Sequence, residues 1–271
     1  MKKYTQLIFI TLLSLSLTSC FQSSTKKGTV DVNRSQLLIV SASDMTKGAN
    51  KAYAKVLAEA KKNNTLNPDP VQLKRVRDIA DRLIPQTKVF RKDAPKWQWE
   101  VNVIKSEQIN AWCMPGGKIA FYTGIIDTLE LNDAEIAAIM GHEIAHALRE
   151  HGRERASHAQ IQGAGMAVFG ILTGVQGPGM DLAAMVMNVT MTLPNSRQHE
   201  VEADRMGVEL SARAGFDPYA AVNVWKKMKR LSRDAPPEFM STHPSNENRI
   251  KDLTKYAKKV NHLYLMAKKP T

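Results

Sequence analysis

The stretch NDAEIAAIMGHEIAHAL, residues 132–148, decides how this sequence folds and where its chemistry lies. Asn132 and Glu135 have the spacing of a capping box, which predicts that a helix begins here. Apolar residues recur along the stretch as they do on the buried face of a helix. His142 and His146 would then share one helix face, so that both imidazoles can reach one metal ion. Glu143 lies beside them, where it can take a proton from a zinc-activated water molecule.

A catalytic zinc ion needs a third protein ligand and one open position. Metzincins place a glycine and a histidine three and six residues after the second histidine, but this sequence has Arg149 and Gly152 there. That class is therefore excluded. On the same helix, His151 and His158 would lie on the side away from His142, so we expect both to point away from the metal.

The next candidate ligand lies in HEVEAD, residues 199–204, on a second predicted helix that begins near Ser196 and ends at Gly215. Glu200 can coordinate zinc, and Asp204, four residues later, can orient a ligand histidine from behind. We expect Glu202 to be a solvated charge on the helix surface, as most such residues are.

The chain before this region mixes helices with short strands. Helices are expected from Ser43 or Asp44 to about Lys62, and from Asp69-Pro70 to Pro85. Residues 97–103 alternate as in a half-buried strand, and 110–114 and 118–122 flank Pro115-Gly116-Gly117 as in a hairpin. From residue 132 the pattern is helical, so the fold class is α+β, mostly helical, with a small sheet beside the metal-binding helix.

Residues 163–193 are apolar, glycine- and methionine-rich, and broken at Gly177-Pro178-Gly179. Neither apolar run is long enough to span a membrane. Two packed core helices with a flexible joint are the simpler interpretation. A mobile apolar cover over the site, or a surface that touches a membrane, is the alternative.

The N-terminus has the pattern of a secretory signal. Lys2 and Lys3 precede an apolar run of about eleven residues, too short for a transmembrane helix, and Leu17-Thr18-Ser19-Cys20 resembles a bacterial lipoprotein cleavage box. We expect a signal peptide at 1–19, lipidation at Cys20, a membrane tether at 20–43 and the catalytic domain at 44–271. Phe21 directly after the anchor would suit sorting to the outer membrane.

The composition is that of a folded protein of 271 residues, 43% hydrophobic and 24% charged, with a formal net charge of +12. Removal of the signal peptide takes away two lysines and no acidic residue, which leaves a net charge of +10. For an exported protein this charge favours anionic headgroups or acidic proteins as neighbours, and we expect no nucleic-acid partner. Cys113 would be the one free thiol of the mature chain, and we expect it to be buried.

Three motifs together resemble metallopeptidase family 48, the zinc gluzincin group of HtpX, the CAAX prenyl endopeptidases and Oma-type proteases. They are H-E-x-x-H at 142–146, E-x-x-A-D at 200–204 and H-P-x-x-x-x-R at 243–249. The similarity covers roughly residues 71–253. The sequence lacks the transmembrane helices of some branches and a tetratricopeptide array, so it is most similar to the periplasmic lipoprotein branch of the LoiP, YcaL and BepA kind.

The resemblance implies a zincin-like gluzincin domain that binds one Zn²⁺ through His142, His146 and Glu200, with Glu143 as general base. It implies that the hairpin at 110–123 borders the cleft, where its edge could pair with an extended substrate. It places His243 near the zinc, either to stabilise the transition state or to occupy the open position as a brake. Arg249 is expected to lie beside Asp204, on the far side of the ligands from the metal.

Three functions follow from these patterns. The first is a zinc endopeptidase, lipid-anchored on the periplasmic side of the outer membrane, whose substrates are misfolded or misassembled envelope proteins. The second is a deformylase-like enzyme with Cys113 as a metal ligand. The third is a latent or chaperone-like assembly lipoprotein whose zinc site is closed by His243 or by residues 163–193. In that protein a basic helix face at residues 226–233 could dock a partner.

Overall fold

The computed structural model describes residues 21–173, 181–231, 238–244 and 248–267. The expected signal peptide, Cys20, the joint at 177–179 and Arg233 lie outside these residues. The described elements are β1 (Phe21–Gln22), β2 (Gln36–Leu37), α2 (Ala42–Lys62), α3 (Pro70–Leu83), η1 (Ile84–Val89), η2 (Ala94–Lys96), β3 (Glu100–Ile104), β4 (Ala111–Met114), β5 (Lys118–Tyr122), α4 (Thr123–Thr128), α5 (Asp133–Leu148), α6 (His151–Thr173), α7 (Leu182–Met187), η3 (Asn188–Thr192), α8 (Arg197–Arg213), α9 (Ala220–Leu231), α10 (Glu238–Thr242) and α11 (Arg249–Ala267).

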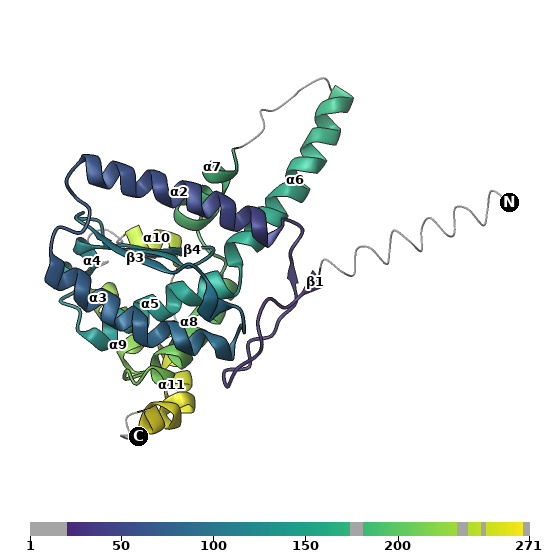
Figure 1. Ribbon diagram of the computed structural model, residues 1–271. Helices are drawn as coiled ribbons and strands as arrows, with labels where there is room; N and C mark the ends of the chain where they lie inside the picture. The colour runs from purple at the N-terminus through teal and green to yellow at the C-terminus, as the bar shows by residue number, and fades with distance from the viewer. Residues whose placement is uncertain (1–20, 174–180, 232–237, 245–247, 268–271) are drawn as a thin grey trace.

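A three-stranded sheet separates two layers of helices (Figure 1). Its strand order is β3-β5-β4, with β3 parallel and β4 antiparallel to β5, so the predicted hairpin at 111–122 is confirmed. Helix α2 covers one face of the sheet, with α7 packed on α2, and α3 and α5 cover the other face. Behind α5 lie α8, α9 and α11. The α+β, mostly helical fold class is confirmed.

Both faces of this sheet are buried, because its side chains alternate between two cores. Val103, Cys113 and Phe121 belong to the larger core shared with α5, whereas Trp112 and Ala120 belong to the smaller core under α2. Alternation along a strand sends neighbouring side chains to opposite faces, so each strand contributes to both cores.

Helix α5 begins where the sequence predicts. The Asn132 side chain accepts a hydrogen bond from the Glu135 backbone N–H at 3.0 Å, and Glu135 Oε2 accepts one from the Asn132 N–H at 3.0 Å. Helix α8 also follows the prediction, with Ser196 as its N-cap and Gly215 in the left-handed region at φ +76°. Both helices of the candidate site are therefore fixed by local sequence signals.

The contact between α5 and α8 depends on two glycines. A β-carbon on Gly207 would lie 2.7 Å from the His142 backbone nitrogen, and one on Gly141 would lie 2.9 Å from the Gly207 carbonyl oxygen. Because neither residue has a β-carbon, the two helix backbones approach closely enough for side chains of α8 to reach those of α5.

Residues 21–41, which we name the N-terminal strap, lie against the domain instead of forming a free tether (Figure 1). Val30 and Leu38 are buried, and the Thr29 and Val30 backbone N–H groups donate to Glu209 Oε2 at 2.8 and 3.0 Å. The polar sequence suggested a tether, but these specific hydrogen bonds and a few apolar anchors hold the strap down. The described part of the expected tether is therefore packed on the domain, and its role as a connection to the membrane stays a prediction.

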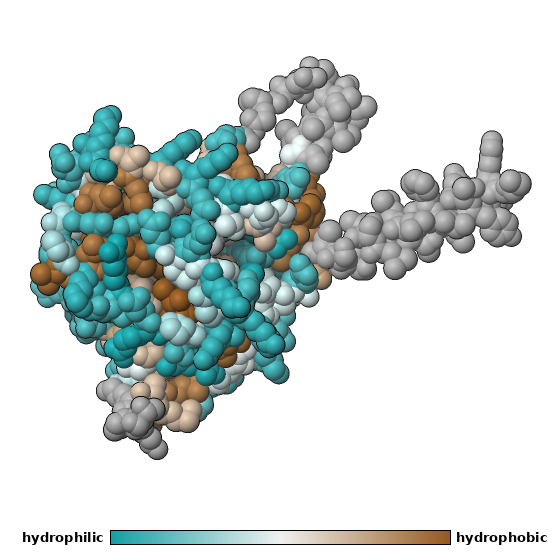
Figure 2. Space-filling model, viewed as in Figure 1, coloured by the Kyte–Doolittle hydropathy of each residue, from teal (hydrophilic) through white to brown (hydrophobic). Residues whose placement is uncertain are grey.

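The region 163–193 is only partly a pair of packed helices. Helix α7 packs on α2 through Ala183 and Val186, and η3 packs against β4. Helix α6 runs outward from the body in Figure 1, and its Ile161 is exposed. None of the described helices is both long enough and apolar enough to cross a bilayer. Figure 2 shows hydrophilic residues over most of one face, with hydrophobic patches between them.

Candidate metal centre

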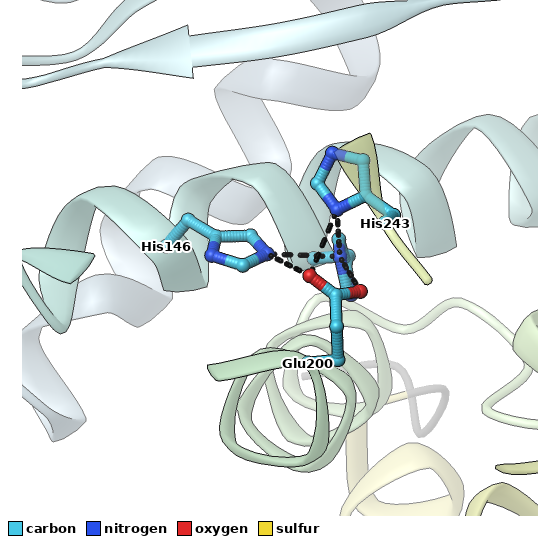
Figure 3. A group of neighbouring side chains, drawn as sticks. His146, Glu200 and His243 are labelled. Atoms are coloured by element: carbon cyan, nitrogen blue, oxygen red, sulfur yellow. Dashed lines mark hydrogen bonds and ion pairs between the residues drawn. The ribbon is translucent and has the colours of Figure 1, made fainter. Parts of the chain in front are cut away.

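Four side chains from three segments converge on one point (Figure 3). His142 and His146 come from α5, Glu200 from α8, and His243 from the residue directly after α10. His142 Nε2 lies 3.0 Å from His146 Nε2 and 3.1 Å from His243 Nδ1. Glu200 Oε1 lies 3.3 Å from His146 Nε2 and 3.1 Å from His243 Nδ1. All four residues are buried.

This donor set fits a zinc ion. Ligand atoms about 2.0–2.1 Å from a tetrahedral zinc lie roughly 3.3 Å apart, close to the spacings seen here. Imidazole nitrogens that face one another this closely cannot all donate, whereas one cation can accept all of their lone pairs. Glu143 Oε1 is also buried and makes no hydrogen bond within the described structure, and it lies 3.5 Å from His243 Nε2.

The pKa shifts differ from one ligand of the cluster to the next. Burial lowers the pKa of His142, but its hydrogen bonds to Asp204 and Glu200 outweigh burial and raise this pKa to about 9. Burial raises the pKa of Glu200, but the nearby His243 and Arg249 charges and its hydrogen bonds outweigh burial and hold this pKa well below its usual range. Burial lowers the pKa of His146 well below its usual value, which keeps that ring neutral and its lone pair available. Burial raises the pKa of Glu143, which brings this carboxyl nearer to the range of a general base.

Asp204 and Arg249 lie behind the ligands on the side of His142. Asp204 Oδ1 is 2.9 Å from His142 Nδ1, which fixes the proton on that nitrogen and leaves Nε2 free to bind the metal. Arg249 is 3% exposed, and its guanidinium lies 2.7 Å from Asp204 Oδ2 and 2.9 Å from Glu200 Oε2. The structure therefore brings together every site residue that the sequence analysis named within the described chain.

Two expectations about neighbouring residues are wrong. His151 does not point away from the metal: its Nδ1 lies 2.8 Å from Nδ1 of His146. One unbroken helix over 142–158 would turn it away, but α5 ends at Leu148 and Glu150 takes a positive φ of 52° before α6 begins. Glu202 is not solvated but 6% exposed, and its Oε2 lies 3.1 Å from His151 Nε2.

Other residues that the sequence analysis did not find complete this buried network. They are Arg34 from the N-terminal strap, Arg149 from the α5–α6 junction, Glu154 from α6 and His199 from α8. His199 lies directly before Glu200 in the sequence, but no local motif marks the other three residues.

A cavity of about 440 Å³ opens onto the cluster. Glu143, His146 and His243 line it, as do Pro115 and Gly116 of the hairpin, so the hairpin borders the cleft as expected. Cys113 also lines it but is not among the four converging ligands. Burial, with the Glu143 charge as the smaller cause, raises the pKa of the Cys113 thiol well above its usual value. This geometry does not support a deformylase-like ligand set.

The model of peptidase family M48 matches residues 70–257, more than two thirds of the chain. The chain belongs to peptidase family M48. The M48 match contains the histidine pair, Glu200, His243 and Arg249, so the resemblance seen in the motifs is confirmed. M48 enzymes are zinc metallopeptidases, and the four-residue cluster is consistent with that cofactor.

Curated M48 relatives come from mitochondria and from bacteria. The chain is 38% identical to the mitochondrial metalloendopeptidase OMA1 of Arabidopsis thaliana over 155 residues, which cover 56% of this chain and 30% of that protein. It is 33% identical to OMA1 of Saccharomyces cerevisiae, over 62% of this chain and 49% of that protein. It is 28% identical to the beta-barrel assembly-enhancing protease of Escherichia coli, over 68% of this chain and 38% of that protein. The match thus spans less than half the length of these relatives.

Proposed function

We propose that this protein is a zinc endopeptidase of the bacterial cell envelope that cleaves misfolded or misassembled envelope proteins. The observation that carries the proposal is the convergence of His142, His146 and Glu200 in a cluster that reaches a cavity through His146, with Glu143 in the cavity wall. The relatives named as metalloendopeptidases and as a beta-barrel assembly-enhancing protease support the reaction and the kind of substrate.

In this proposal the protein supplies the positions and the proton transfers. A bound zinc ion would supply Lewis acidity toward water and the peptide carbonyl. Glu143 Oε1 would accept the proton of the attacking water and return it to the leaving amine. The hairpin rim would hold the substrate in the cavity, and the buried surroundings would limit access of bulk water to the scissile bond.

Glu143→Gln tests this reaction. We expect the full-length variant, purified in detergent, to cleave casein about 10²–10⁴-fold more slowly than the wild type, because its amide cannot accept the proton. Zinc content, measured by mass spectrometry of the metal, is expected to stay at one ion per chain. Equal cleavage by both proteins would refute the mechanism.

Lipid anchoring at Cys20 is the second part of the proposal. It rests on the cleavage box in the sequence, and Phe21 beside it is 57% exposed. Because the strap is bound to the domain from Ser23, whose Oγ accepts a hydrogen bond from Arg149 Nη1 at 3.0 Å, an anchor at Cys20 would hold the catalytic domain close to the membrane surface. Cys20→Ala is expected to abolish incorporation of labelled palmitate and to release the protein from outer-membrane fractions. Unchanged labelling would exclude Cys20 as the modified residue.

A latent enzyme or assembly factor is the alternative, favoured by the position of His243. Its Nδ1 lies as close to His142 and Glu200 as a fourth ligand would, where it can occupy the open position. His243→Ala is then expected to increase casein cleavage. If no variant cleaves any substrate, a binding role is favoured. In the basic helix face expected to dock a partner, Lys227 lies 2.8 Å from Glu135 Oε2 and is therefore already paired.

A further inference from the structure

The histidine behind His146 is part of the described network but not of the metal cluster. His151 is fully buried, and its Nδ1 lies 2.8 Å from His146 Nδ1, the nitrogen that faces away from the other ligands. The His151 ring stacks on that of His199, with centroids 4.3 Å apart and 15° between the planes. The stacking holds the His151 ring in the plane that its hydrogen bonds require.

Chemistry sets the direction of the hydrogen bonds in this chain. If His146 binds zinc through Nε2, its proton must sit on Nδ1, which then donates to His151 Nδ1. His151 must therefore carry its own proton on Nε2, which donates to Glu202 Oε2 at 3.1 Å. An ionised carboxylate can only accept hydrogen bonds, so Glu202 fixes the tautomer of His151 and, through it, the tautomer of His146.

Glu202 is itself held from two sides. Arg149 Nε donates to its Oε2 at 2.9 Å, and Arg34 Nε donates to its Oε1 at 2.7 Å. Arg149 also binds the strap, because its NH2 group donates to the Arg34 carbonyl at 3.0 Å. Arg34 therefore connects residues that lie shortly after the N-terminus of the mature chain to a side chain two steps from the metal cluster.

We propose that His151 is a positioning residue for His146, and that Arg34 of the N-terminal strap completes its support through Glu202. Zinc affinity then depends on the strap being docked, so the strap is a part of the metal site and not only a connection to an anchor. The inference rests on the proposed function in one respect, namely that His146 binds zinc.

His151→Leu and His151→Asn form the central test. Leucine removes the acceptor for the His146 N–H, whereas the asparagine amide oxygen can accept it from nearly the same place. We expect leucine to raise the zinc Kd about 10–100-fold and asparagine to restore most of that loss, because partners behind a ligand contribute on this scale. The Kd is measured on the full-length protein by competition with a chromophoric chelator, and Co²⁺ absorption reports the ligand geometry.

The outcomes separate this inference from the proposed function. If the wild type binds no zinc, the proposed function fails. If the wild type binds zinc and His151→Leu keeps both its Kd and its Co²⁺ spectrum, the positioning role is refuted. If both variants lose affinity equally and their metal-free forms unfold at equally lowered temperatures, His151 is a packing residue and the inference is again refuted.

Arg34→Met tests the strap, with Lys27→Met as its matched control. Lys27 lies on the same strap but makes only an exposed pair with Asp31 at 3.7 Å. We expect Arg34→Met to raise the zinc Kd several-fold and Lys27→Met to leave it unchanged. Because Arg34 acts through His151, adding Arg34→Met to His151→Leu is expected to cause little further loss. The role of the strap would be overturned if the effects of Arg34→Met and His151→Leu on zinc affinity were fully additive. It would also be overturned if Arg34→Met and Lys27→Met changed the zinc Kd equally.

Discussion

The two histidines of the H-E-x-x-H motif are supported in different ways. His142 is held by one carboxylate, Asp204, which lies on the same helix as the ligand Glu200 and is paired with Arg249. His146 is held through a neutral imidazole, His151, and the carboxylate follows one step later. The first support uses a spacing within one helix, whereas the second needs the α5–α6 junction, α8 and the strap.

The difference shows how each support can fail. The His142 support is short and completely buried, so its loss leaves charged groups unpaired in the interior. The His146 support is longer and ends at Arg34, whose side chain is 26% exposed, so changes at the surface of the molecule can reach it. We therefore expect the stability of the fold to depend more on the His142 support, and changes in metal affinity to arise more from the His146 support.

The largest expected effect comes from removing the cation of the His142 support. Arg249→Met leaves Glu200 and Asp204 buried without their shared arginine, so the free energy of unfolding of the metal-free protein is expected to fall by about 3–5 kcal/mol. Urea denaturation in EDTA measures it. Lys74→Met is the control, because Lys74 makes an exposed pair with Asp78, and the loss of this pair is expected to cost less than about 1 kcal/mol. Equal losses would contradict the comparison.

Asp204→Asn and Glu202→Gln compare the two carboxylates directly. Asp204→Asn is expected to raise the zinc Kd about 10–100-fold, because it removes the charge that touches His142 Nδ1. Glu202→Gln is expected to raise the zinc Kd less. Its amide oxygen can still accept a hydrogen bond from His151, and the change lies one residue farther from the metal. Chelator competition measures both. A larger effect of Glu202→Gln would reverse the proposed order.

The sequence was sufficient to predict the parts of the site that depend on helical periodicity. The capping box, the i,i+4 histidines and the E-x-x-x-D spacing each place side chains within one element, and family resemblance added His243 and Arg249. The hairpin was predictable for the same reason, since Pro115-Gly116-Gly117 is a local signal.

The parts that could not be predicted depend on backbone breaks and on contacts between distant segments. A positive φ at Glu150 turns His151 toward the site. Glutamate does not favour this conformation, so the sequence does not predict the turn. Glu202 is buried because Arg34, 168 residues away in sequence, covers it. Exposure of a helical glutamate is a sound expectation on average, but it fails where long-range packing supplies buried cations.

The smallest expected effect concerns the outer end of the His146 support and its dependence on pH. Burial raises the pKa of Glu154, but hydrogen bonds from Arg34, His199 and Gln36 outweigh burial and hold it well below its usual value. A carboxyl whose folded-state pKa is depressed stabilises the protein above its unfolded-state pKa, and this contribution is lost as the pH falls. Glu154→Gln is therefore expected to cost about 1–2 kcal/mol at pH 7.

The difference in unfolding free energy between Glu154→Gln and the wild type should narrow as the pH falls below about 4.5, the region where unfolded glutamate takes up its proton. Urea denaturation at pH 7, 5 and 3.5 measures it. Asp78→Asn is the control, because Asp78 makes only an exposed pair with Lys74, and no pH-dependent difference is expected there. A difference that widens in acid would mean that Glu154 is not ionised in the folded protein. The outer end of the His146 support would then lack the charge that holds Arg34 in place.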